Sequence, residues 1–366
     1  MSLAIERPIP IARPQLGPDE ESAVLEVLRS GQLVQGPRVA VFESAFAAAV
    51  GGANGVATSS GSTALYLALL AHGIGRDDEV ITSPLTFIAT ANAIVQAGAR
   101  PRFADVDATF NLDPNAVEGL IGPRTRALMP VHLHGNPADM VALAEIASRR
   151  GLVLIQDACQ AIGALIGGRP LGAFGTAVYS LYATKNITTG EGGMIITDDP
   201  AVAARCARLR HQAYASGGNY EHDEVGFNFR LTEMQAAIGL CQLARLAAVT
   251  AARRATAAYY DAHIDSAKYG RPAVLPGHTH VYHQYVLVPR PESGLTRDSV
   301  RAALDEKGIG TGVHYPVPVH LQRPYRGSQV SCPAAERAAA TMLSIPVHPG
   351  VSEAERERVA ADLNAL

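Results

Sequence analysis

One lysine of this chain occupies a position where its amine could act as a nucleophile. The 31 basic residues include only three lysines, and arginine supplies all the others. Two of the three, Lys268 and Lys307, need no chemical role, and Lys307 beside Gly308 suits a helix end. Lys185 instead lies between a strand-like stretch and the turn at residues 188–192, whose glycines let the backbone approach a ligand closely. An amine can attack a carbonyl group, which a permanently charged guanidinium cannot do.

A carboxylate that precedes this lysine by 28 residues suggests what the amine would attack. Asp157 follows the apolar stretch 152–156, and the carboxyl ends of parallel strands face the ligand crevice. Pyridoxal phosphate combines an aldehyde, which an amine can bind covalently, with a ring nitrogen that a carboxylate keeps protonated. Lys185 and Asp157 together therefore predict this cofactor. Each residue alone has an ordinary alternative, a lysine on a surface loop or an aspartate that caps a helix.

A turn of small hydroxyl residues predicts the phosphate site. Residues 59–63 read Ser-Ser-Gly-Ser-Thr and open an alanine- and leucine-rich segment that we expect to be a helix. The free N–H groups and the positive dipole end of a helix bind anions, and hydroxyl groups add donors. Ser180 would supply a further hydroxyl to the same phosphate. Helix capping alone also accounts for such a turn.

An aromatic side chain is needed to stack on the pyridine ring, and the chain contains no tryptophan. Phe87, which ends the segment Ser-Pro-Leu-Thr-Phe at 83–87, is the candidate. A place in the hydrophobic core is its alternative.

The elements that must position these residues alternate between helix and strand. We expect helices at residues 38–50, 62–72 and 89–96, and strands at 55–58, 79–82, 101–103, 127–132, 152–156, 178–182 and 194–197. Such alternation predicts an α/β fold with a mostly parallel central sheet. A long helical stretch at 231–264 would lead to a smaller α+β unit, with strands at 285–288 and 312–315 and helices at 296–307 and 334–342. We therefore expect a large domain over residues 1–248 and a small C-terminal domain over residues 249–366.

Composition narrows the classes of function. A chain of 366 residues, 48% hydrophobic and 18% charged, is typical of a folded protein, and its net charge of −3 argues against a nucleic-acid partner. The longest apolar run, 64–71, is too short to cross a bilayer, and the first residues lack the apolar core of a signal peptide. The four cysteines are widely spaced, without the pattern of a metal or disulfide framework. We expect a cytoplasmic protein without a membrane partner.

The ordered motifs of the chain resemble those of the sugar aminotransferases of the DegT/StrS type. Besides the Lys185 segment at 180–194, the matching segments are 35–37 (QGP), 59–61 (SSG), 86–90 (TFIAT), 130–140 (PVHLHGNPADM), 157–161 (DACQA), 226–231 (GFNFRL), 235–237 (QAA), 314–316 (HYP) and 344–346 (SIP). The resemblance extends over nearly the whole chain. It implies a pyridoxal phosphate-dependent transferase of fold type I, which is the fold of aspartate aminotransferase.

The resemblance also implies a role for each matching residue. Lys185 resembles the lysine that forms the Schiff base, Asp157 the partner of the ring nitrogen, and Gln160 the residue that hydrogen-bonds the ring hydroxyl. Phe87 matches the stacking aromatic, and His314 and Tyr315 lie where relatives meet the sugar substrate. The phosphate would be held by Gly61, Ser62, Ser180 and, from the neighbouring subunit of a homodimer, Asn228.

Three positions depart from the family pattern. Residues 59–62 read Ser-Ser-Gly-Ser where the family usually has Ser-Asn-Gly-Thr, which keeps a hydroxyl. His134 replaces the more common tyrosine, and Cys159 replaces an alanine. None of these changes affects the Schiff base, but His134 and Cys159 would alter the pocket.

Other chemistries have weaker support. His132 and His134 would lie on one face of a strand, as a metal site requires, but no cysteine or carboxylate pattern accompanies them, and we expect no metal. The Gly-x-Gly-x-x-Gly fingerprint of nicotinamide enzymes, the Gly-Lys-Ser/Thr triplet of P-loop enzymes and the serine-hydrolase elbow are all missing. Pyridoxamine-dependent sugar dehydratases resemble the chain but carry histidine in place of Lys185.

The resemblance implies transfer of an amino group from an amino acid, L-glutamate above all, to a keto sugar. Pyridoxamine phosphate would be the intermediate form of the cofactor. We expect a nucleotide-linked deoxysugar, with a 4-keto group favoured over a 3-keto group. A keto cyclitol such as scyllo-inosose is one alternative. The other is a non-catalytic regulator that binds pyridoxal phosphate, although a mere binder would not need Lys185, Asp157 and Gln160 together.

Overall fold

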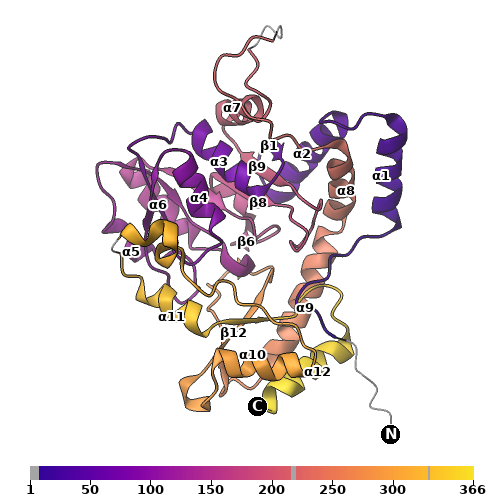
Figure 1. The fold of residues 1–366 in the computed structure, drawn as a ribbon, viewed down its shortest axis with the longest axis vertical. Coiled ribbons are helices and arrows are strands. Elements are labelled where there is room, and N and C mark those ends of the chain that lie inside the picture. Colours follow the sequence, from indigo (N-terminus) through magenta and orange to yellow (C-terminus); the bar gives the residue numbers. More distant parts are fainter. Residues whose placement is uncertain (1–7, 216–219, 329) are drawn as a thin grey trace.

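The computed structural model describes residues 8–215, 220–328 and 330–366, which form a large upper part and a smaller lower part (Figure 1). Its α-helices are α1 Pro18–Ser30, α2 Pro37–Val50, α3 Gly61–Ala71, α4 Ala89–Gln96, α5 Pro114–Glu118, α6 Met140–Arg150, α7 Pro200–Arg210, α8 Glu233–Ala244, α9 Leu246–His263, α10 Arg297–Glu306, α11 Pro333–Thr341 and α12 Glu353–Asn364. Its strands are β1 Asn54–Thr58, β2 Glu79–Thr82, β3 Arg100–Phe103, β4 Thr125–Met129, β5 Val153–Asp157, β6 Leu165–Ile166, β7 Arg169–Pro170, β8 Thr176–Ser180, β9 Gly193–Thr197, β10 Tyr269–Gly270, β11 His278–Thr279, β12 Tyr285–Pro289 and β13 Leu343–Ile345. The predicted α/β class is confirmed.

A seven-stranded sheet forms the centre of the large part. Its order is β1-β9-β8-β5-β4-β2-β3, and of these strands only β9 runs antiparallel to its neighbours. Asp157 at the end of β5 pairs with Val178 of β8, and Ser180 at the end of β8 pairs with Gly193 of β9. The sheet therefore brings Asp157, Ser180 and the segment that carries Lys185 to one edge.

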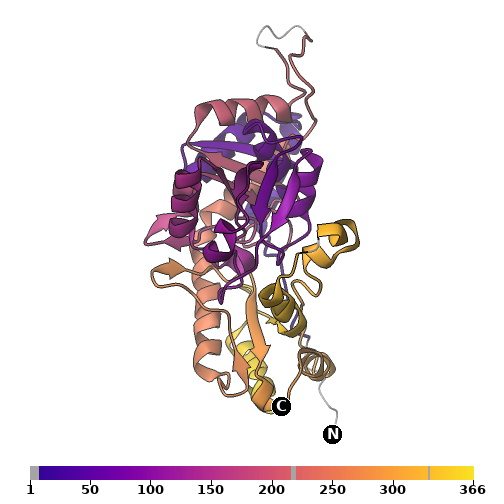
Figure 2. The ribbon, with the colours of Figure 1, turned by 90° about the vertical axis from the view of Figure 1, so that its left-hand side faces the viewer.

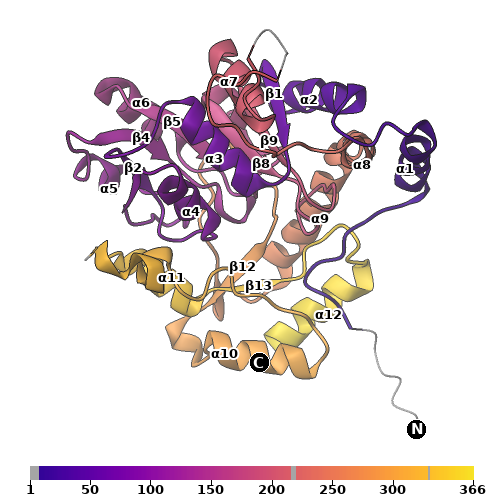
Figure 3. The same ribbon diagram turned by 45° about the horizontal axis from the view of Figure 1, so that its top comes forward.

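Helices cover both faces of this sheet, as Figure 3 shows. On one face, α3, α4 and α7 pack on buried side chains such as Val178 and Ile195, and on the other face α2 and α6 pack around Tyr179 and Ile196. The central helix α3 contributes Leu65, which is fully buried, and burial of such a side chain stabilises the fold by about 2 kcal/mol. This apolar anchoring fixes the amino-terminal end of α3 at the edge where the site forms.

A three-stranded antiparallel sheet, ordered β10-β12-β13, lies in the smaller part below (Figure 2). Its core contains Tyr260, Tyr269 and Tyr285, together with residues of α10 and α12. Ile9 from the start of the described chain is buried in the same core and pairs with Ile309. The boundary between residues 248 and 249 stays a prediction, and the first residues of the described chain pack with the C-terminal unit.

The helical stretch predicted at 231–264 is two helices. The chain bends by 57° between α8 and α9, at Arg245. The side chain of Arg245 donates to the Gln15 carbonyl and pairs with Glu20 of α1. This contact holds the bend where α8 packs on α1 and α9 leaves for the smaller part.

Three predicted strands are wrong in extent or in kind. The strand expected at 127–132 ends at Met129, because Pro130 has no N–H group to continue the ladder and a short 3-10 helix follows at Leu133–Gly135. His132 and His134 therefore do not share a strand face. Residues 312–315 form no strand, since Gly312 makes only an isolated bridge to Ser344. The strand expected at 178–182 ends at Ser180.

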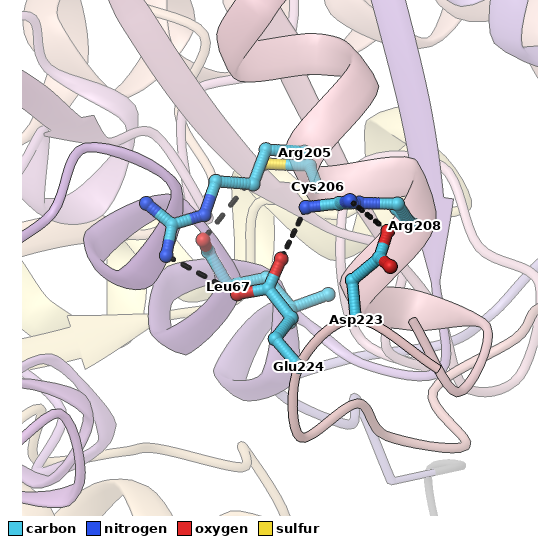
Figure 4. Close-up of polar contacts among 6 residues, drawn as sticks. All are labelled: Leu67, Arg205, Cys206, Arg208, Asp223 and Glu224. Carbon is cyan, nitrogen blue, oxygen red and sulfur yellow. Dashed lines mark hydrogen bonds and ion pairs between the residues drawn. The ribbon is translucent and has the colours of Figure 1, made fainter. Parts of the chain in front are cut away.

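An arm between α7 and α8 projects beyond the large part, at the top of Figures 1 and 2. At its base, Arg208 of α7 pairs with Asp223, at 3.2 Å, and with Glu224 (Figure 4). Arg205 reaches the same Glu224 at 3.3 Å. Partly exposed pairs of this kind contribute about 0–1 kcal/mol each, so their main effect is to orient the arm.

Within the described ranges, no single helix has the length and apolar character to span a bilayer. The bent pair of α8 and α9 passes that test when the two are taken together, by length and composition only.

Candidate active site

The amine of Lys185 is free within a cavity of about 470 Å³ at the edge of the large sheet. The backbone turns at this lysine, where its N–H group donates to the Tyr182 carbonyl at 2.9 Å. Within the part of the chain that the structure describes, the amine has no hydrogen-bond or ion-pair partner. Burial lowers the pKa of Lys185, and the nearby Asp157 carboxylate acts in the opposite direction. Burial therefore makes the neutral amine, which is the nucleophilic form, easier to reach than it is in water.

Asp157 is held in one orientation by two donors. The Thr90 hydroxyl donates to Oδ2 at 2.7 Å, and the Cys159 N–H group donates to Oδ1 at 3.1 Å. The carboxylate is 6% exposed, and that exposed edge faces the cavity. These bonds hold the carboxylate in one orientation beside the space that Lys185 also lines.

Thr90 is a functional residue that the sequence analysis did not single out. It is the second residue of α4, and its hydroxyl also contacts that of Thr86 at 2.9 Å. The signal was present in the segment 86–90, where two threonines stand four residues apart, one before α4 and one at its start.

A hydrogen bond from the His134 backbone fixes the orientation of the Gln160 side chain. Its Oε1 atom accepts a hydrogen bond from the His134 N–H group at 2.7 Å, so its amide N–H groups point away, one of them to the Tyr315 hydroxyl at 3.2 Å. His134 in turn donates from Nε2 to the His314 carbonyl at 2.9 Å. Burial lowers the pKa of His134 to about 4, and this keeps the ring neutral. The result is a fixed donor, Gln160, at the cavity wall.

The amino-terminal end of α3 forms a cradle for an anion. Ser60 caps this helix and accepts from the Thr63 N–H group at 3.1 Å, while Gly61 and Ser62 begin the helix with N–H groups that have no acceptor within it. A side chain at Gly61 would meet Ser180 Cβ at 2.9 Å and Cys159 Sγ at 3.0 Å. Only glycine therefore fits between the cap of α3 and the end of β8.

Phe87 is not a core residue. Its side chain is 55% exposed and lines the cavity, with its ring centre 5.8 Å from that of Tyr315. The core alternative is therefore wrong, and a flat aromatic face is available to a ring bound in the cavity.

The structure brings nearly all of the predicted residues together. Those that line the cavity are Gly61, Ser62, Phe87, Asp157, Gln160, Ser180, Lys185, His314 and Tyr315. Asn228 does not. It lies at the base of the arm, exposed to solvent and paired through the backbone with His211.

His283 also lines the cavity, and the sequence analysis missed it. The residue is 8% exposed, neither ring nitrogen has a partner among the described residues, and burial lowers its pKa, aided by the charge of Lys185. It directly precedes the strand predicted at 285–288, next to Gln284, so its place beside a strand end was its only signal.

The histidine pair proposed as a rival metal site has other partners. The Nε2 atom of His132 contacts Gln156 at 3.1 Å, and its Nδ1 atom accepts from the Ala138 N–H group at 3.0 Å. Over the described ranges, no group of three or more histidine, cysteine or acidic residues is arranged to hold a metal ion.

The chain is similar to known proteins over nearly its whole length. The chain is 42% identical to a pleiotropic regulatory protein of Geobacillus stearothermophilus, over 94% of this chain and 93% of the relative. It superposes on S. venezuelae DesV, solved in complex with a ketimine intermediate, with a TM-score of 0.90 at 40% identity, over 94% of this chain and 93% of that one. It also superposes on DesI, solved in the presence of its TDP-sugar product, with a TM-score of 0.92 at 31% identity, over 99% and 93% of the two chains.

A family model covers all of the residues that line the cavity. The model of the DegT/DnrJ/EryC1/StrS aminotransferases matches residues 14–364. This range contains every residue of the site described above, and it spans both the large sheet and the smaller C-terminal part. The chain therefore belongs to the DegT/DnrJ/EryC1/StrS aminotransferase family, whose members use pyridoxal phosphate.

Proposed function

We propose that this sugar aminotransferase moves an amino group from L-glutamate to the keto group of a nucleotide-linked deoxysugar, with a 4-keto group favoured. The observation that carries the proposal is the free amine of Lys185 in one cavity with the hydrogen-bonded carboxylate of Asp157. In the overall exchange, the ketone oxygen of the sugar is replaced by an amino group and a hydrogen, while glutamate becomes 2-oxoglutarate.

The residues present fit pyridoxal phosphate. The cradle at the start of α3 offers unpaired N–H groups and the Ser62 and Ser180 hydroxyls to a phosphate, and Gly61 leaves the space for it. Asp157 would meet a protonated ring nitrogen, Gln160 would donate to the ring hydroxyl, and Phe87 would cover a ring face. When bound, the cofactor supplies an electron sink for the bonds at the reacting carbon.

Lys185 and Asp157 would have different roles in the reaction. Lys185 would hold the cofactor covalently. Once its amine is released, that amine would accept the proton from the donor's α-carbon and later return a proton to the product. A neutral amine is needed for that step, which agrees with the lowered pKa of Lys185. Asp157 holds its charge toward the ring nitrogen because Thr90 and the Cys159 N–H group fix both of its oxygens.

A nucleotide-linked substrate is supported by DesI, which was solved in the presence of its TDP-sugar product. In this chain, His314 and Tyr315 line the same cavity as Lys185, where they would contact the sugar. The keto position follows from the resemblance of the turn at 188–192, and a keto cyclitol is the alternative substrate.

Asn228 would act in a second copy of the chain. Its exposed place beside His211, outside its own cavity, suits a residue that reaches the phosphate of a neighbouring subunit. The proposal therefore includes a homodimer with shared active sites. A cytoplasmic location is supported by the four cysteines, all of which are free.

A regulatory function is the second candidate, because a relative 42% identical over 94% of this chain carries a regulatory name. A regulator and an enzyme differ in one simple property. Both could bind pyridoxal phosphate, but only an enzyme should convert the bound cofactor when an amino donor is added.

The test is an activity panel. Purified protein with pyridoxal phosphate and L-glutamate is incubated with 4-keto and 3-keto nucleotide sugars and with keto cyclitols, and the products are identified by mass spectrometry. We expect exchange of oxygen for an amino group on a nucleotide-linked 4-keto sugar. If glutamate bleaches the cofactor absorbance but only keto cyclitols are aminated, the substrate is a cyclitol and the sugar assignment is wrong. Cofactor binding without any response to glutamate would favour the regulator.

A further inference from the structure

A second cavity lies on the other side of the segment that carries Lys185. It has a volume of about 220 Å³, and Thr184 and Lys185 line both cavities. The side chains that give the second cavity its polarity are Arg13, Gln15, Gln242, Arg245 and Arg253. We call it the arginine cavity.

Arg253 is a buried charge without a counter-ion. It lies on α9 and is 5% exposed. One of its nitrogens, Nη1, donates to the carbonyls of Tyr282 and His283 at 3.0 and 3.3 Å. Its Nε atom is buried and has no partner, and no carboxylate of the described chain pairs with the guanidinium. Burial lowers the pKa of Arg253 to about 10, so the side chain keeps its charge at neutral pH.

The other two arginines do not offset that charge. Arg245 is paired with Glu20, and Arg13 lies 3.9 Å from Glu355, so each has an acidic neighbour of its own. Of the described residues that line the arginine cavity, none is acidic. A buried charge that is not compensated by the protein is costly, and an anion in the cavity would remove that cost.

We propose that the arginine cavity binds a small oxyanion, a phosphate or a carboxylate group, with Arg253 as its main partner and Arg13 at its entrance. The planar guanidinium suits such a ligand because it can donate two parallel hydrogen bonds. The volume of about 220 Å³ accepts a phosphate ion or a short dicarboxylate. The site is distinct from the phosphate cradle at α3, which opens into the Lys185 cavity.

An anion bound in the arginine cavity would change the electrostatic potential in the Lys185 cavity. Arg253 fixes the carbonyl of His283, whose ring lines the Lys185 cavity, and Thr184 and Lys185 form the wall between the two cavities. An anion beside Arg253 would therefore reduce the positive potential on the far side of that wall.

Calorimetric titration of the protein saturated with pyridoxal phosphate tests the site, with inorganic phosphate in one series and succinate in the other. The variants are Arg253→Gln and, as the matched control, Arg254→Gln, which removes the same charge from an exposed position on the same helix. We expect Arg253→Gln to weaken binding at least about 10-fold and Arg254→Gln to leave it unchanged. The series that shows the loss identifies the ligand as a phosphate or a carboxylate.

Three results would overturn the proposal. They are no binding in either series, equal binding by the wild type and Arg253→Gln, and an equal loss in Arg253→Gln and Arg254→Gln. If Arg253→Gln does not fold, Arg13→Gln is the variant that tests the site, because Arg13 is half-exposed and its replacement should not disturb folding. It should weaken binding about 3-fold or more, and unchanged binding would contradict the site.

Discussion

The two sides of the Lys185 cavity differ in how their polar groups are held. On the side of β5 and α4, Asp157 accepts from two donors and Gln160 is fixed by the His134 N–H group. Elsewhere in the same cavity, the Lys185 amine has no partner within the described chain, and Nδ1 of His283 is buried without one. We refer to these as the held side and the free side.

The difference suggests a division of work. Groups that fix a ligand in place gain from hydrogen bonds formed before it binds, since they then lose little entropy on binding. A group that must form a bond and carry a proton needs a lone pair that no neighbour occupies. Changes on the free side should therefore affect turnover most, and changes on the held side should affect cofactor retention as well.

The largest effect is expected from Lys185→Arg. The guanidinium keeps the positive charge but cannot form the covalent bond or exchange the proton, so turnover should fall by at least about 10⁴-fold. Steady-state rates with glutamate and a keto sugar measure this. Lys307→Arg is the control, since that exposed lysine pairs with Asp362 far from the cavity. If Lys185→Arg turns over at the wild-type rate, the Lys185 amine is not required for the reaction.

Asp157→Asn should give the next largest effect. The amide keeps the shape but loses the charge that stabilises a protonated ring nitrogen, so kcat should fall by about 10²–10³-fold and cofactor should be lost more readily. Equilibrium dialysis with pyridoxal phosphate and the rate assay give both values. Asp113→Asn, which keeps a cap at the start of α5, should behave as the wild type. A variant with normal retention and normal kcat would contradict the role of the held side.

Thr90→Val tests whether the hydrogen bonds around Asp157 matter. Valine has the same shape without the hydroxyl, and loss of a hydrogen bond to a charged group should lower kcat by about 10-fold. Thr341→Val on α11 removes an exposed hydroxyl and should change nothing. If Thr90→Val and Thr341→Val have the same kcat, the fixed orientation of Asp157 is not required.

The smallest effect concerns acid stability on the held side. The pKa values of His132 and His134 are lowered to about 4, below the ordinary value, so the unfolded chain binds more protons than the folded one between pH 6.5 and 4. Stability is complete above pH 6.5 and falls as the pH drops, by about 1.4 kcal/mol per pH unit for each ring.

His134→Asn tests this slope. Asparagine tolerates the positive φ of 61° at that position, and it should reduce the loss by about 1.4 kcal/mol per pH unit. Urea unfolding at pH 7, 6 and 5 measures the slope. An unchanged slope would show that His134 does not stay neutral in the folded chain.

The sequence predicted the fixed parts of the site better than its surroundings. Strand ends and a helix start place Asp157, Ser180 and Gly61, and such positions follow from periodicity and turn residues. The end of β4 at Met129 could have been predicted from Pro130, whereas the bend at Arg245 depends on a contact between distant segments, that of Arg245 with Glu20. The same holds for His283, which belongs to no motif, and for the role of Thr90, which lies in the segment 86–90 but meets Asp157 only through packing.

The most direct test of the account is to trap the covalent bond to the cofactor. The protein is incubated with pyridoxal phosphate, reduced with borohydride and digested, and the modified peptide is identified by mass spectrometry. We expect the label on Lys185 alone, with no label in Lys185→Arg. A label on Lys268 or Lys307, or no label at all, would contradict the central claim.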